Sequence, residues 1–129
     1  MREILFRGKR TDNKQWVEGF YARIGEENPS AYIIINNGHR IRVAHKSISQ
    51  YTGLTDKNGK KIFEGDIVKG LFSYHMPVNS VVCFRDGAFG LLWHRGDVEM
   101  YWAFTSICNV EYEVIGNIHN NPDLVKGEQ

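Results

Sequence analysis

Apolar and polar residues alternate with a period of two along much of this chain, and Gly, Asn and Asp separate the alternating runs. This period is that of β-strands, whose successive side chains point to opposite faces. The run at 15–24 alternates in this way. The runs at 31–35 and 39–45 flank Asn36-Asn37-Gly38, and Asn-Gly after a β-branched run predicts a β-hairpin. The chain is therefore expected to be mainly β.

The C-terminal half continues the strand pattern and ends in one helix signal. A second hairpin turn is predicted at 85–87, and the residues at 96–104 fit either a strand or a short helix. Asn121 as cap, Pro122 and Asp123 in the first turn, and Gly127 beyond predict a short C-terminal helix. Further strands are predicted at 66–72, 80–84, 88–93 and 110–118.

The bulk composition is that of an ordinary globular protein. A chain of 129 residues fits one domain, 1–129, or one domain of two intertwined β subdomains, and no composition break marks a boundary. No apolar run approaches the roughly 18 residues of a membrane helix, and the N-terminus lacks a signal-peptide pattern. Cys83 and Cys108 form no disulfide framework, which favours the reducing cytoplasm.

The net charge of +1 conceals an asymmetry along the chain. Residues 1–69 hold 13 Lys and Arg against 8 Asp and Glu (+5), and residues 70–129 hold 3 against 7 (−4). Such polarity favours head-to-tail association of copies, which closes into a ring if the rotation allows, or binding of nucleic acid by the basic part. A fold that interleaves the two halves would remove the polarity.

Residues 51–70, "YTGLTDKNGKKIFEGDIVKG", concentrate polar residues in a pattern that resembles a ligand site. A calcium loop that begins at Asp56 needs glycine at its sixth position and glutamate at its twelfth, but Gly59 is fourth and Glu64 is ninth. A phosphate loop needs G-x-x-x-x-G-K-[ST], which is absent. Turn chemistry explains the residues instead: Asp56 bonds backbone two residues on, and Gly59 and Gly65 supply bends.

At this stretch the sequence resembles the YopX protein family of bacteriophages and prophages. The matching motifs are "REILFRG" near the start, "YTGLTDKNGKKIFEGDIVK", and "EVIGNIHNNPDLV" near the end. The resemblance implies a mostly-β fold that includes a small SH3-like barrel, and it brings no catalytic residues. We therefore expect a strongly bent sheet with such a barrel. The family signature, interpreted as structural, consists of Thr52, Gly53, Asp56, Asn58, Gly59, Glu64, Gly65 and Asp66.

Other candidates for chemistry are weak. Cys83 and His94 are eleven positions apart, as are Cys108 and His119, but zinc sites usually take paired ligands from short knuckles that this chain lacks. No nucleophile elbow or other catalytic motif occurs. We therefore expect no catalytic residue, no metal and no cofactor, and a non-catalytic protein.

Nucleic-acid binding is the strongest alternative to self-association. Arg40 and Arg42 are expected on the wet face of their strand, opposite Ile41 and Val43. Aromatic side chains that could stack on bases alternate nearby, as on β-barrel single-strand binders. The near-neutral overall charge argues against this function. The candidate contacts are Arg40, Arg42, Lys60 and Lys61, and the candidate stacking residues are Trp16, Phe20 and Tyr21.

Overall fold

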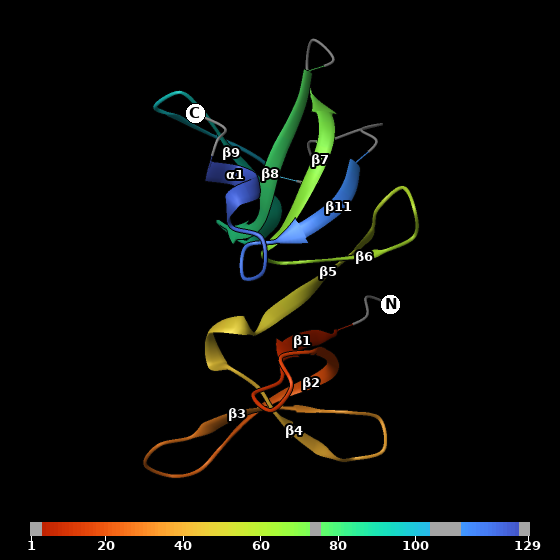
Figure 1. Cartoon of the computed structure of the whole chain (residues 1–129), viewed down its shortest axis with the longest axis vertical. Helices are drawn as coiled ribbons and strands as arrows, with labels where there is room; N and C mark the ends of the chain where they lie inside the picture. Colours follow the sequence, from red (N-terminus) through yellow and green to blue (C-terminus); the bar gives the residue numbers. More distant parts are fainter. Residues whose placement is uncertain (1–3, 73–75, 104–111, 127–129) are drawn as a thin grey trace. The chain divides into compact units, whose positions relative to one another are not determined.

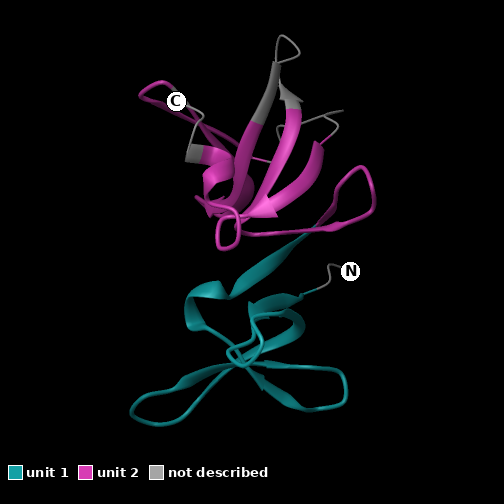
Figure 2. Ribbon diagram, in the orientation of Figure 1, with its two compact units in different colours: residues 1–53 teal, residues 54–129 magenta. Residues whose placement is uncertain are grey.

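A computed structural model describes residues 4–72, 76–103 and 112–126 of the chain. They form a mainly β protein, as predicted, with two antiparallel sheets. The chain divides into two compact units that are consecutive in sequence, residues 1–53 and 54–129 (Figure 2). No helix in the described ranges is long and apolar enough to cross a membrane.

The first unit is a sheet of short antiparallel strands (Figure 1). Its strand order is β4-β3-β2-β1-β5, and the last residues of β5 pass into the second unit, where β6 follows. The hairpin predicted at 36–38 is confirmed, with Gly38 at φ 87° and Ile33 paired with Ile41. The elements are β1 (Phe6–Lys9), β2 (Trp16–Ile24), β3 (Ser30–Ile34), β4 (Arg40–Arg42), the 3-10 turn η1 (His45–Ser47) and β5 (Ser49–Thr55).

The core of the first unit gathers on one face of this sheet. Ala31, Ile33 and Val43 are buried there, and Ile33 is fully covered. Tyr21 belongs to the same side, since its ring lies 5.8 Å from that of Phe6. The other half-buried members are Val17, Ile35 and Ile48. Because alternate residues point to opposite faces, this core leaves the other face of β2, β3 and β4 outside.

The second unit is a five-stranded antiparallel sheet with one short helix (Figure 1). Its strand order is β10-β9-β8-β7-β11. The predicted turn at 85–87 joins β8 to β9, with Asp86 at φ 54° and Gly87 at φ 84°. The open alternative at 96–104 is decided for residues 98–103, which form a strand paired with β9. The elements are β6 (Lys61–Phe63), β7 (Asp66–Phe72), β8 (Met76–Arg85), β9 (Ala88–Arg95), β10 (Val98–Ala103), β11 (Tyr112–Asn117) and α1 (Asp123–Lys126).

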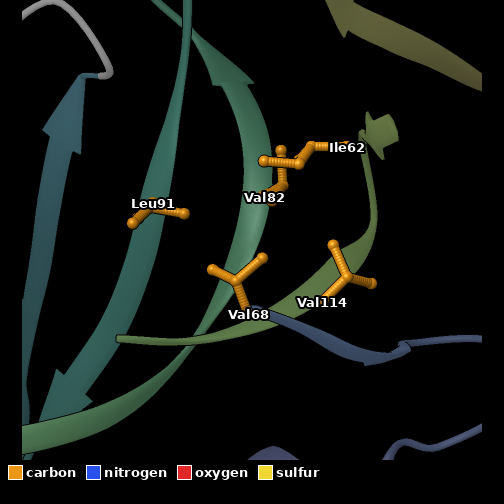
Figure 3. Close-up of a cluster of buried hydrophobic side chains, with 5 residues drawn as sticks. All are labelled: Ile62, Val68, Val82, Leu91 and Val114. Atoms are coloured by element: carbon orange, nitrogen blue, oxygen red, sulfur yellow. The ribbon is translucent and has the colours of Figure 1, made fainter. Parts of the chain in front are cut away.

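Five aliphatic side chains from five strands form the core of the second unit (Figure 3): Ile62, Val68, Val82, Leu91 and Val114. Trp93, Trp102 and Tyr112 pack against this cluster, and the two indole rings meet edge to face at 5.8 Å. Four of these five strands, β7, β8, β9 and β11, lie in runs that the sequence predicted as strands, whereas β6 was not predicted.

The predicted C-terminal helix is present as a single turn. The Asn121 carbonyl accepts the N–H of Leu124 at 3.1 Å, while the Asn121 side-chain oxygen accepts the N–H of Asn117 at 3.2 Å. The side chain of Asn121 therefore joins the start of the helix to the end of β11, a contact that the sequence did not predict. Gly127 and the predicted strand residues 110 and 111 lie outside the described residues.

Candidate functional site

Asp56 anchors the corner between β5 and β6. Its carboxylate is almost wholly buried, with 6% of the residue exposed. Oδ1 accepts the N–H groups of Asn58 and Lys60, both at 2.9 Å, while Gly59 completes the turn at φ 81°. Residues 56–60 therefore form a tight turn that is held by the Asp56 carboxylate.

Asp56 also makes a contact that the sequence did not predict. Its Oδ2 accepts the N–H of Val114 at 2.9 Å, which joins the corner to the core strand β11 across 58 positions of sequence. Burial is the largest influence on the carboxyl and would raise its pKa. The N–H donors of Val114, Lys60 and Asn58 outweigh burial, so the pKa of Asp56 is lowered.

This lowered pKa makes the stability of the second unit depend on pH. Asp56 is expected to contribute its full stabilisation above its unfolded pKa of about 3.9 and to lose it as pH falls through the lower folded pKa. An Asp56→Asn variant cannot titrate at this position. Urea denaturation from about pH 7 to about pH 3 should show the stability gap between wild type and Asp56→Asn narrowing. A gap that stays constant would contradict the assignment.

The second half of the corner is held by Gly65 and Asp66. Gly65 has φ 86°, donates its N–H to the Val82 carbonyl at 2.8 Å and accepts the N–H of Ile118 at 2.9 Å. Asp66 is 1% exposed, and its Oδ2 accepts the N–H of Phe63 at 2.8 Å. This carboxylate closes the turn between β6 and β7. Glu64 is half-buried beside them.

The remaining signature residues lie in the middle of β5. Thr52 is buried with 8% exposure, and Gly53, at φ 91°, is the last residue of the first unit. Across the described segments, no group of three His, Cys, Asp or Glu side chains is placed to hold a metal ion. The carboxylates of Asp56 and Asp66 in this corner accept hydrogen bonds from backbone N–H groups.

The two cationic pairs proposed for nucleic acid belong to different units. Lys60 is exposed in the corner turn, and Lys61 is half-buried at the start of β6, both in the second unit. Arg40 and Arg42 lie in the first unit, exposed on β4 as predicted, while Ile41 and Val43 turn inward. The neighbours of Arg40 and Arg42 are therefore residues of the first-unit sheet.

Cross-strand register places aromatic and basic side chains on one face of β2, β3 and β4. Phe20 pairs with Ile34, and Ile34 pairs with Arg40, so these three form one row. Tyr32 pairs with Arg42 in the next row. Directly paired residues in an antiparallel sheet share a face. We call Phe20, Tyr32, Ile34, Arg40 and Arg42 the open face.

The sequence analysis found only part of the open face. Phe20 is on it, but Tyr21, grouped with Phe20 as a stacking candidate, is on the core side, because neighbours along a strand point oppositely. Tyr32 and Ile34 were missed. A hairpin turn centred on Asn37 already fixes their pairing with Arg42 and Arg40, so the turn position was the signal that could have found them.

The other candidate side chains show ordinary structural surroundings. Cys83 is half-buried on β8, and burial raises the pKa of its thiol, which favours the protonated form. Glu99 on β10 binds Arg85 at 2.6 Å and lies 3.8 Å from the His94 ring nitrogen. These are exposed pairs of the kind common on protein surfaces. Cys108 lies outside the described residues.

Comparisons with known proteins identify relatives over nearly the whole chain. The family model described as YopX protein matches residues 5–126. A crystal structure of protein EF1440 from Enterococcus faecalis is similar, with 26% identity and a TM-score of 0.58. The match covers 98% of this chain and 100% of that one. Among curated proteins, none matches the sequence.

Proposed function

The chain belongs to the YopX protein family, and from that premise we propose that it is a non-catalytic binding module that associates with copies of itself. Its proposed setting is a phage or prophage, with the protein acting in the cytoplasm of the bacterial host. We also propose that its β-structure includes the small SH3-like barrel that the family resemblance implies. Among the described residues the pairing gives two sheets with open strand orders.

The observation that carries self-association is the division of charge between the compact units. The first unit has 9 Lys and Arg against 5 Asp and Glu, or +4, and the second has 7 against 10, or −3. The units are consecutive segments, so the charge difference along the sequence persists between them. A basic unit of one copy is complementary to the acidic unit of the next, and such a heterologous contact repeats into rings or filaments.

Salt should control this association. Sedimentation velocity at about 50 mM salt is expected to show oligomers, and at about 500 mM the monomer should dominate, because salt screens exposed charges. The Arg40→Glu/Arg42→Glu variant lowers the first unit's net charge from +4 to 0 and should remain monomeric at low salt. The charge-preserving Arg40→Lys/Arg42→Lys variant is its control. A wild-type monomer that ignores salt would end the proposal.

Nucleic-acid binding is the second candidate function. It is favoured by the exposure of both Arg40 and Arg42 on a solvent-facing side of β4, in the unit with positive net charge. Guanidinium groups bind phosphate through paired N–H donors. Fluorescence anisotropy with labelled DNA and RNA tests it, and affinity should fall steeply with added salt. Lack of binding at low salt would remove this candidate.

A further inference from the structure

Phe20 is an unusual residue to find exposed in the middle of a strand. It is 64% exposed at the centre of β2, the largest exposed fraction among the exposed large hydrophobic residues of the described chain. The opposite face of the same sheet holds the core, so burial of Phe20 is not needed to build that core. Single exposed apolar side chains are common on protein surfaces, so the neighbours of Phe20 decide whether it belongs to a binding surface.

The half-buried neighbours Ile34 and Tyr32 extend this surface into an apolar and aromatic area. Ile34 lies directly beside Phe20 across the β2–β3 pair, and Tyr32 occupies the next position on the same face of β3. The guanidinium of Arg40 lies 5.8 Å from the centre of the Tyr32 ring, within cation–π range. Aromatic rings and a stacked guanidinium thus lie together in three adjacent strands.

The charge on the open face is positive and ordered along β4. Arg40 and Arg42 are two residues apart on one strand, which separates their backbones by about 7 Å. Both are exposed, and the unit that carries them has a net charge of +4. Glu18, an exposed acid on the same face, lies two residues before Phe20 on β2. Arg40 and Arg42 border the aromatic area on the β4 side of the sheet.

We propose that the open face binds single-stranded nucleic acid, with bases stacked on Phe20 and Tyr32 and phosphates bound by Arg40 and Arg42. Any base can stack on an aromatic ring, and a bordering row of cations follows the backbone of an unpaired strand. In a duplex the bases are stacked on one another, so their faces are not available to side chains on a sheet. This inference rests on the second candidate function above, and it names the ligand class and the surface.

The first test compares two exposed phenylalanines. Anisotropy of a labelled 20-nucleotide oligothymidine with the full chain should show a Phe20→Ala loss of at least about fivefold, the lower end for a lost stacking contact. Phe84 is also exposed, at 53%, but lies in the second unit, so Phe84→Ala should bind like wild type. Circular dichroism establishes that both variants are folded. Equal binding by wild type and Phe20→Ala would overturn the proposal even if the oligonucleotide binds.

The second test concerns the arginines and the form of the ligand. Arg40→Ala/Arg42→Ala should weaken binding and reduce the slope of log affinity against log salt by about 1.4, for two lost phosphate contacts on a single strand. Arg23→Ala is the matched control, because Arg23 is exposed on β2 but lies on the face opposite to Phe20. The same sequence presented as a duplex should bind more weakly than the single strand. Equal or tighter duplex binding would overturn the inference.

A second copy of this chain is the competing occupant of the open face. If no oligonucleotide binds at low salt, both the inference and the nucleic-acid candidate fail. If Phe20→Ala then also reduces the size of the sedimenting species, the open face serves self-association instead. Oligonucleotide binding that survives Phe20→Ala leaves the nucleic-acid candidate standing and refutes only the stacking surface.

Discussion

Replacing Asp56 with alanine is expected to lower the free energy of unfolding of the second unit by about 3 kcal/mol. Its carboxylate accepts N–H groups from Asn58, Lys60 and Val114, and hydrogen bonds to a charged acceptor are stronger than neutral ones. The turn donors can bond water once the carboxylate is gone. The N–H of Val114 lies in a core strand, so its loss of partner contributes most of the expected effect.

Tryptophan positions allow this effect to be measured for the second unit alone. Trp93 and Trp102 pack on the second-unit core, and Trp16 is in the first unit, so a Trp16→Phe background leaves only second-unit fluorescence. Urea denaturation in this background should show Asp56→Ala with a lower midpoint. Asn58→Ala is the control in the same turn, because its backbone N–H remains, and it should change stability by less than about 0.5 kcal/mol. Equal effects of the two variants would refute the anchoring role.

The local chemistry of this corner could be predicted, whereas its distant partner could not. Asp-x-Asn-Gly defines a turn through contacts within five residues, and the structure places Asp56 and Gly59 accordingly. The bond from Val114 depends on β11 pairing with β7 and reaching the corner. Nothing in either local sequence specifies that approach, because pairing partners are set by the whole sheet. The segment resembled a ligand site because carboxylates that accept buried backbone N–H groups are of the same residue types as carboxylates that bind a metal ion.

The same distinction applies to the strands. Alternation correctly predicted that Arg40 and Arg42 face away from Ile41 and Val43. Residues 98–103 carry apolar side chains at both parities, so their period could not decide between strand and helix, and pairing with β9 decided it. On the open face, the position of the hairpin turn determines the register that pairs Tyr32 with Arg42. The set of alternate residues of β2 that is buried depends on the packing around Ile33, and this packing is visible only in the folded structure.

Gly90 in β9 is expected to tolerate no side chain, and Gly90→Ala should destabilise the second unit by about 2 kcal/mol or more. A Cβ at this position would lie 2.5 Å from the Trp102 carbonyl oxygen and 2.6 Å from Cζ of Tyr101. Gly90 pairs with Ala103 on β10 and with Cys83 on β8, so it is held between two strands. The phenol of Tyr101 is itself fixed, since it donates to the Ala88 carbonyl at 2.9 Å.

The ring and the backbone carbonyl can be separated by a double variant. Tyr101→Ala removes the ring but leaves the Trp102 carbonyl, which belongs to a paired strand and cannot retreat without disturbing the β9–β10 ladder. Urea denaturation in the Trp16→Phe background, followed by Trp93 and Trp102 fluorescence, should therefore show that Gly90→Ala still destabilises the Tyr101→Ala variant, by less than it destabilises the protein with Tyr101. If it is harmless there, the ring alone excludes the methyl group, and the close approach of the two backbones is refuted. If the full loss remains, the carbonyl is the whole obstacle.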